Sequence, residues 1–482
     1  MAGKREAQQV QRKPEEKNIA YWYSSCENPG ADAWYRTDFP IRHRAEKVDV
    51  TASIQGGNAY VTVSDTPGGA VLGIGTSLEE TSLYNLRRMP EEAQRAILRE
   101  WVDPNKMGLS VFRLTIGTAD FTARDFYTYY DTPPTGEPDW ENRSGQGFSI
   151  QKDEQYGILA CVKRLQEEAE KAGVTPLFFA SPWSPPGWMK KPTRKSSHYK
   201  HNDAKLKGGR LDSRYLPDYA RYLTRYLEEY EKRGISVSAL TLQNEALFET
   251  CYPSCLVSPE QEAELGRLLR QEIRNSPLLQ KPVALWLYDH NFAQAAAYIE
   301  RAGKAGAMAW CDGFALHDYE GEPEQMLPLM ARYPGKRWYM TERALWGAAG
   351  AARILRYMAA GAGTYVNWVN LLDTNGQTHQ WPGKPGPTFM LQNAEEPSVI
   401  RRLPEYYWLS LLGRSIRPGD RLLSCESKEV EAAAFLSSDG KKKKVLLVNT
   451  GTQEKVVAVR MADRLVQILL PAQHVGALWV AE

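Results

Sequence analysis

The sequence predicts an α/β protein built around a (β/α)8 TIM barrel that carries an antiparallel β-sandwich, and three observations support this fold class. Short apolar runs alternate eight times with longer segments of helical period between residues 71 and 414. The runs are nearly continuous in apolar residues, as the buried strands of a parallel sheet are. After residue 414 the helical period stops and short strand-like runs follow. Eight βα units over about 340 residues match a barrel with several long loops.

The N-terminal part of the chain contains two kinds of segment. The first 18 residues, MAGKREAQQVQRKPEEKN, are polar throughout and predict a disordered tail. Further on, KVDVTASI and AYVTVSD alternate apolar and polar residues on either side of QGGN, which predicts a β-hairpin near residues 47–64. We therefore expect residues 19–69 to contribute strands to the β-sandwich.

The (β/α)8 barrel, expected to be the catalytic domain, is predicted over residues 70–414. Its strands are expected at 71–78, 109–117, 175–182, 238–245, 282–289, 311–319, 337–343 and 364–371. Its helices are expected at 82–101, 153–172, 215–233, 259–275, 292–304, 322–333, 347–360 and 404–414. The alternative is a doubly wound open sheet, which usually carries a glycine-rich phosphate loop after its first strand. Here GIGTSL lacks the third glycine and is followed by two glutamates, which would repel phosphate.

The last part of the chain, residues 415–482, contains short strand-like runs separated by turns. They are RLLSCES, EVEAAAFLS, KKVLLVNT, EKVVAVR, RLVQILLP and VGALWVA. With the N-terminal hairpin they predict an antiparallel β-sandwich that is built from both chain ends and clamps the barrel. The lysines of SSDGKKKK are interpreted as a solvated flank of a hairpin turn.

Composition and charge limit the classes of function. The 482 residues carry a net charge of +2, so no global field favours nucleic acid or an anionic membrane as a partner. The 14 Trp and 25 Tyr suit core packing and also the flat apolar faces of sugar rings. No apolar stretch has the length of a signal-peptide core or a membrane span, so we expect a cytoplasmic protein without an integral membrane segment. The oligomeric state is left open.

Metals and cofactors are not expected. The six cysteines fit free thiols in a reducing cytosol. Cys251 and Cys255 in CYPSC are close enough in sequence to share a metal, but no second Cys/His pair has zinc-site spacing. The chain also lacks an HExxH pattern and the nucleophile elbow of a serine hydrolase.

Polar and aromatic side chains gather where the predicted strands end, and barrels of this kind carry their chemistry at the C-terminal ends of the strands. In chain order these side chains are Glu79, Glu80, Asp120, Trp183, Trp188, Asn244, Glu245, Asp289, His317, Tyr319, Glu342, Trp368 and Asn370. Each has an ordinary structural interpretation, such as a cap for Glu245 or an ion pair of Glu342 with Arg343. Independent structural roles would not place a polar group at nearly every strand end, which favours a functional site.

Two of these carboxylates predict glycoside hydrolysis. That reaction needs one acid to protonate the leaving oxygen and one carboxylate to attack or stabilise the anomeric carbon. Glu245 ends the fourth predicted strand and Glu342 ends the seventh, so the barrel places them on opposite sides of its mouth. We expect the negative charge of Glu342 to raise the pKa of Glu245 and keep it protonated near neutral pH.

The blocks GIGTSLEETSLYNL, FRLTIGTADF, FFASPWSPPGWMK, LTLQNEA, FALHDY and YMTE occur in this order and resemble glycoside hydrolase family 30, the family of glucosylceramidases and related retaining β-glycosidases. The resemblance extends from about residue 70 to 415, and the flanking sandwich matches as well. It implies a retaining double displacement with Glu245 as general acid/base and Glu342 as nucleophile.

The resemblance also implies residues that bind the sugar. Asn244 would hold the 2-hydroxyl, Trp183 would wall the pocket of the non-reducing sugar, and Glu80 would hold outer hydroxyls. Further residues that would line the site are Arg113, Asp120, His317, Tyr319 and Trp368. Two positions depart from the family pattern. Ala246 stands where proline is common after the acid, and Glu80 stands where many members have aspartate.

The expected function is hydrolysis of β-glycosidic bonds in small glycosides or oligosaccharides, similar to that of a glucosylceramidase or β-glucosidase. The alternatives within the family are an endo-glycanase and a β-xylosidase. An alternative from another class is a non-catalytic carbohydrate-binding protein on a degenerate barrel. The sequence leaves open the identity of the sugar, the linkage, and exo against endo cleavage.

Overall fold

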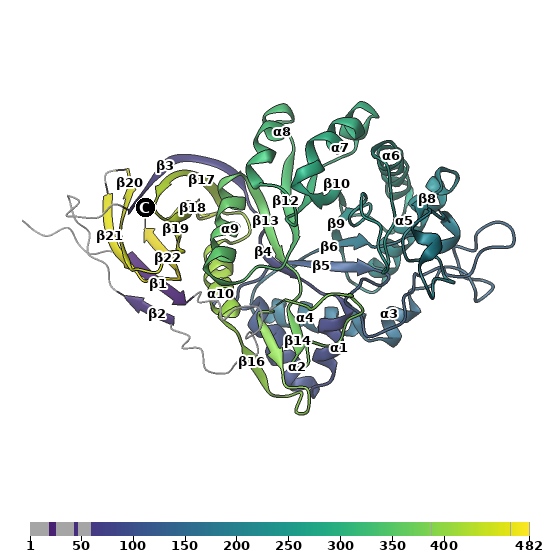
Figure 1. The fold of residues 1–482 in the computed structure, drawn as a ribbon, viewed down its shortest axis with the longest axis horizontal. Coiled ribbons are helices and arrows are strands. Elements are labelled where there is room, and N and C mark those ends of the chain that lie inside the picture. The colour runs from purple at the N-terminus through teal and green to yellow at the C-terminus, as the bar shows by residue number, and fades with distance from the viewer. Residues whose placement is uncertain (1–18, 26–42, 47–58, 387, 463, 482) are drawn as a thin grey trace, which may run out of the picture.

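The structure is a computed structural model that describes residues 19–25, 43–46, 59–386, 388–462 and 464–481. The predicted tail 1–18 and the first half of the predicted hairpin lie outside these residues. Figure 1 shows a barrel beside a curved sheet, with helices α9 (Gly347–Ala359) and α10 (Pro404–Ser415) between them. Among the described residues no helix combines the length and apolar character needed to cross a membrane.

The barrel is closed and all of its strand pairs are parallel. Its strands are β4 (Gly73–Ser77), β5 (Val111–Ile116), β6 (Leu177–Pro182), β9 (Val237–Thr241), β10 (Ala284–Asn291), β11 (Gly313–His317), β12 (Arg337–Arg343) and β13 (Ala362–Asn367). Each lies within or across a predicted strand, which confirms the (β/α)8 prediction. The sequence signal is strong because these strands are covered by helices outside and packed side chains inside.

The barrel helices also follow the prediction, apart from two that divide. They are α1 (Glu80–Arg87), α2 (Glu91–Val102), α3 (Gln151–Gln155), α4 (Ile158–Lys171), α5 (Leu216–Lys232), α6 (Pro259–Asn275), α7 (Phe292–Lys304) and α8 (Met326–Arg332), followed by α9 and α10. The helix predicted at 82–101 breaks before Pro90, because proline lacks the N–H group and clashes with the preceding turn. The helix predicted at 153–172 breaks at Gly157, which has a left-handed φ of 69°.

Short elements occur in the loops that connect the strands and helices of the barrel. A two-stranded sheet joins β7 (Lys190–Lys191) to β8 (Arg210–Leu211). A three-stranded sheet contains β14 (Leu371–Asp373), β15 (Met390–Gln392) and β16 (Ile400–Arg402). The 3-10 turns are η1 (Gly187–Met189), η2 (Ser196–His198), η3 (Ser213–Tyr215), η4 (Ala307–Ala309) and η5 (Pro323–Gln325). All of these elements except η4, which lies between α7 and β11, are in loops that follow barrel strands, where the fold tolerates added chain.

Both chain ends build the second sheet, as predicted. Its order is β2-β1-β22-β19-β18-β17-β3-β20-β21. The strands are β1 (Ile19–Ser25), β2 (His43–Glu46), β3 (Ala59–Ala70), β17 (Arg421–Lys428), β18 (Glu431–Leu436), β19 (Lys442–Asn449), β20 (Lys455–Met461), β21 (Arg464–Leu470) and β22 (His474–Ala481).

This sheet differs from the predicted antiparallel sandwich in two respects. It is one continuous sheet, and β3 pairs with β20 in parallel while the other neighbours are antiparallel. The sheet rolls over on itself around an apolar core, so that the Tyr21 hydroxyl of β1 reaches the Leu469 carbonyl of β21 at 3.4 Å. The strong twist of a long sheet allows one sheet to enclose a core that the sequence pattern assigns to two.

A buried carboxylate holds the long loop that leaves β5 and returns to α3. Asp153 of α3 accepts hydrogen bonds from the hydroxyls of Tyr127 at 2.9 Å, Tyr129 at 2.6 Å and Tyr230 at 2.7 Å. Tyr127 and Tyr129 belong to the loop, and Tyr230 belongs to α5. The loop also carries Asp120 at the barrel mouth, so this cluster helps to position the site. Burial, which raises the pKa of Asp153, outweighs the three hydroxyls, which lower it, and the pKa rises to about 6.

The Asp153 cluster predicts a pH dependence of stability. Because the folded pKa is raised from 3.8 to about 6, the folded chain binds more protons than the unfolded chain in this window. The contribution of Asp153 to the free energy of unfolding should therefore fall as pH rises from about 4 to 6. Asp153→Asn should remove this slope. Urea unfolding of the wild type and of Asp153→Asn across this pH range measures the slope. If the free energy of unfolding of the wild type minus that of the variant stays constant or rises with pH, the assignment is contradicted.

Candidate active site

The expected site residues come from separate strands and meet at one end of the barrel. Arg113 belongs to β5, His317 ends β11, and Glu342 lies near the end of β12. Glu245 follows β9 in a turn. Because the strands are parallel, their C-terminal ends share one rim, and residues far apart in sequence become neighbours.

A cavity of about 870 Å³ opens at this rim. Of the predicted residues, Asp120, Trp183, Asn244, Glu245, Tyr319, Glu342 and Trp368 line it. Its outer part is apolar and includes Leu247, Phe248, Trp346 and Trp381. The rings of Trp183 and Trp368 stack with their centroids 5.2 Å apart. The volume is typical of a site for a small ligand, and the floor combines carboxylates with aromatic faces.

Arg113 is a fully buried cation beneath the cavity. Its guanidinium donates to Glu342 Oε2, to Asn244 Oδ1 at 2.8 Å and to Asp289 Oδ2 at 3.0 Å. It also lies 4.7 Å from the centre of the Trp183 ring. Burial alone would lower the pKa of Arg113, but the charges of Asp289 and Glu342 raise it. The arginine therefore stays charged and orients one oxygen of Glu342.

The other oxygen of Glu342 is also held. Tyr319 donates its hydroxyl to Glu342 Oε1 at 2.9 Å. His317 Nδ1 lies 3.9 Å from the same oxygen and 3.4 Å from Glu245 Oε1. One imidazole nitrogen thus borders both carboxylates, and both line the same cavity.

The backbone at the site contains unusual conformations. Glu245, Tyr288 and Asp289 have positive φ values of 51°, 92° and 53°. The pairing of β10 with β11 shifts register between Tyr288 and His290, as in a β-bulge. The Glu245 amide donates to the Asp289 carbonyl at 2.9 Å. Such bulges re-aim side chains near active sites, and here Asp289 contacts Arg113 while the next residue, His290, faces Glu245.

The prediction that the charge of Glu342 raises the pKa of Glu245 is wrong. Burial raises its pKa, but contacts with His290 and His317 outweigh burial and hold the pKa below the ordinary value. The charge of Glu342 acts instead on His317, where together with Asp289 it overcomes burial and raises the pKa to about 9. His317 and Glu245 therefore hold one proton between them, and it resides on the imidazole.

Glu80 does not lie where the resemblance placed it. It is not among the residues that line the cavity, and it is 4% exposed. Its carboxylate accepts from Thr122 Oγ1 at 3.1 Å and from the Ala123 amide at 2.6 Å, and it pairs with Arg124 at 3.2 Å. The longer side chain of glutamate lets it bind this loop. Arg113 and His317 are likewise fully buried beneath the lining and act on it from below.

Several residues of the site were not predicted. His290 contacts Glu245, and Trp346 and Trp381 line the cavity. The apolar run predicted to end at residue 289 continues to Asn291, and the polar pair His290 and Asn291 at its end was the available signal. Trp381 comes from an irregular segment after β14, where no periodicity reveals which residues face the site.

Cys251 and Cys255 are free cysteines and form no disulfide. Cys251 is exposed and Cys255 is buried. Burial raises the pKa of Cys255 to about 11, so its thiol is neutral at physiological pH.

The comparisons with known proteins agree with the sequence resemblance. The family model described as glycosyl hydrolase family 30 TIM-barrel domain matches residues 71–325. An endo-1,6-β-D-glucanase of Neurospora crassa is 28% identical over 345 residues, which are 66% of this chain and 65% of that protein. The chain thus spans slightly less than two thirds of that relative. A putative glucosylceramidase 2 of Caenorhabditis elegans is 25% identical over 409 residues, covering 78% and 74%.

A solved structure supports the fold. The structure of an endo-β1,6-glucanase aligns with a TM-score of 0.78 and covers 96% of this chain and 99% of its own. The two sequences are 21% identical, so this likeness concerns the barrel and its attached sheet.

The buried arginine predicts a large stability effect. Arg113→Met leaves Asp289 and Glu342 without their buried cation and should lower the free energy of unfolding by about 3–5 kcal/mol. The matched control is Arg301→Met, which breaks an exposed pair with Glu260 at 3.0 Å and should cost at most about 1 kcal/mol. Denaturant unfolding of both variants measures the difference. Equal losses in the two variants would show that Arg113 does not compensate these carboxylates.

Proposed function

Because this chain belongs to glycosyl hydrolase family 30, we propose that it hydrolyses β-glycosidic bonds with retention of configuration. Glu342 is the nucleophile and Glu245 is the general acid/base. The observation that carries the proposal is that both carboxylates line one cavity and border the same nitrogen of His317. Retaining enzymes need two carboxylates that flank the glycosidic bond closely.

In the first step Glu342 attacks the anomeric carbon. Arg113 and Tyr319 hold its two oxygens, so the carboxylate keeps one orientation. The new bond joins a Glu342 oxygen to the anomeric carbon, and the bond to the leaving oxygen breaks. That oxygen takes a proton from Glu245. The pair of Glu245 and His317 already holds this proton, and the sugar that fills the cavity excludes water and so favours the uncharged form of the pair.

In the second step the ester is hydrolysed. Formation of the ester removes the negative charge of Glu342, and Glu245 is now a carboxylate that accepts a proton from water. The water oxygen bonds to the anomeric carbon from the face that the leaving group occupied, and the bond to Glu342 breaks. Two inversions restore the original configuration.

Several lining residues suit sugar binding. The Oδ1 atom of Asn244 accepts from Arg113, so its amide NH₂ is available to donate to the 2-hydroxyl of the sugar. Trp183 and Trp368 offer apolar surface for a ring face. We assign to Asp120 the role expected of Glu80, which is to hold outer hydroxyls of the sugar. Burial and the charge of Glu342 raise its pKa well above the ordinary value, so it can donate as well as accept hydrogen bonds to sugar hydroxyls.

We propose a β-glucoside as substrate. The relatives named above are described as an endo-1,6-β-D-glucanase and a putative glucosylceramidase, and both names contain a glucose unit. The match to the fungal protein specifically favours a second candidate, cleavage of 1,6-linked β-glucan. Aryl β-glycosides of glucose, xylose, galactose, fucose and glucosamine, together with β-1,6-glucan and glucosylceramide, distinguish these substrates. Thermal stabilisation by sugars without turnover of any of them would instead support a carbohydrate-binding protein.

Variants of the two carboxylates test their roles separately. Glu342→Ala should lower kcat by roughly 10³-fold or more, because the covalent step is lost. Azide should partly restore turnover of an aryl β-glucoside and give the α-glycosyl azide, since it attacks opposite the leaving group. Glu245→Ala with azide should give the β-glycosyl azide, since azide then attacks the glycosyl–enzyme ester.

The control for these variants is Glu320, a carboxylate on the cavity wall that has no proposed role. Glu320 is exposed and accepts from Gln294 at 3.0 Å, and Glu320→Ala should stay within a few-fold of the wild-type rate. Nuclear magnetic resonance of the azide products decides between the roles. An α-azide from the Glu245 variant, or full activity of the Glu342 variant, would refute the assignment.

A further inference from the structure

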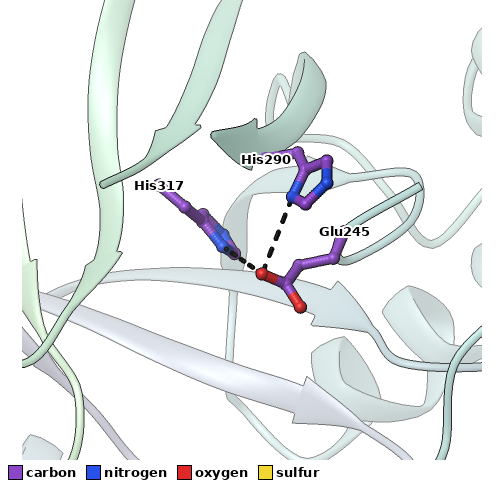
Figure 2. A group of neighbouring side chains, drawn as sticks. All are labelled: Glu245, His290 and His317. Atoms are coloured by element: carbon purple, nitrogen blue, oxygen red, sulfur yellow. Dashed lines mark ion pairs between the residues drawn. The ribbon is translucent and has the colours of Figure 1, made fainter. Parts of the chain in front are cut away.

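Three side chains converge on one point of the cavity wall. Figure 2 shows both imidazole rings directed at the carboxylate of Glu245. His317 Nδ1 lies 3.4 Å and His290 Nδ1 lies 3.6 Å from Glu245 Oε1. The three potential ligand atoms all lie within 4.8 Å of one another. They come from three different strand ends, so the barrel and not a local sequence pattern brings them together.

Among the described residues, the Nδ1 atoms of His290 and His317 make ion-pair contacts but no hydrogen bond. Neither His290 Nδ1 nor His317 Nδ1 has a hydrogen-bond partner within the described part of the chain, and the contacts to Glu245 are ion-pair contacts. Both residues are nevertheless buried, with exposures of 6% and 0%. A buried polar atom without a partner is costly and rare in native proteins. Two such atoms aimed at one carboxylate oxygen point to a ligand that binds between them.

We propose that Glu245, His290 and His317 bind a borderline divalent transition-metal ion, Zn²⁺ or Cu²⁺, and that the bound ion inhibits the enzyme. Two imidazole nitrogens and one carboxylate oxygen are a ligand set that suits these ions, whereas Mg²⁺ and Ca²⁺ prefer oxygen ligands alone. Tetrahedral bonds of about 2.0–2.1 Å to zinc separate neighbouring ligand atoms by roughly 3.3–3.5 Å. The separations of 3.4 and 3.6 Å are close to this geometry.

The surroundings of His317 support a metal ligand. Its Nε2 atom contacts Asp289 Oδ1 at 3.1 Å, and Thr341 donates to the same oxygen at 2.6 Å. A carboxylate behind an imidazole keeps the proton on the far nitrogen and leaves the near nitrogen as a ligand. Glu245 also lines the cavity, so the fourth coordination position is open to water.

Inhibition follows from the identity of the third ligand. A carboxylate that is bound to a metal cannot deliver a proton to a leaving group. This consequence rests on the proposed function, because it requires Glu245 to be the general acid. The binding of the ion itself does not depend on any activity, so the two parts can be tested separately.

The test measures zinc binding to the full chain by competition with a chromogenic chelator, and Co²⁺ binding by its visible absorption. The wild-type chain should bind one Zn²⁺ ion or, in its place, one Co²⁺ ion. Bound Co²⁺ should show the strong visible absorption bands of four-coordinate geometry. His290→Ala and Glu245→Gln should each weaken zinc binding by about 100-fold or more, since each removes a direct ligand. His198→Ala and Cys251→Ser, which change an exposed imidazole and an exposed thiol, should bind zinc like the wild type.

The second arm measures hydrolysis. Zinc should inhibit the wild-type enzyme, and a chelator should restore the rate. In His290→Ala the rate with zinc, divided by the rate without zinc, should be closer to one than in the wild type. Circular dichroism confirms that each variant is folded. Absence of zinc binding by the wild type, or binding by folded His290→Ala with unchanged affinity, would overturn the proposed site. Absence of hydrolysis in a chain that binds zinc would refute the proposed function and leave the site supported.

Discussion

The structure of the site depends on one buried cation. Arg113 lies on a barrel strand with no exposure to solvent, and it contacts Glu342, Asn244 and Asp289 together. A lone buried arginine would be very costly, and so would the buried carboxylates without it. The charges are tolerable only as a set. This mutual dependence fixes the side chains of the proposed nucleophile, Glu342, and of Asn244, which is proposed to bind the sugar, in one arrangement.

Asp289 connects this cation to the acid/base side of the cavity. Its side chain contacts Arg113 and His317, and its carbonyl accepts the amide of Glu245. A register shift in β10 makes both contacts possible, because the residues on either side of it no longer alternate simply between core and surface. The same shift turns His290 toward Glu245. One local irregularity therefore determines which groups surround the proposed acid.

Charge in the cavity is distributed in a way that suits two successive roles. Glu342 is held by a permanent cation, whereas Glu245 faces the imidazoles of His290 and His317. A nucleophile benefits from constant ionisation, and an acid/base benefits from a neighbour that titrates. The imidazoles that make this possible also form a ligand set for a transition metal, so the features that suit catalysis expose the site to inhibition by metals.

The sequence by itself determined the barrel and the two carboxylates at its mouth. Eight buried strands leave a periodic apolar pattern, and Glu245 and Glu342 stand at the ends of two of them, so both features are visible without tertiary information. The tertiary structure alone decided the partners. Glu80 turned to Arg124, the flanking strands closed as one rolled sheet, and His290 came to face Glu245. Periodicity records whether a residue is buried, but contacts between strands depend on register, bulges and loop paths, which no local pattern encodes.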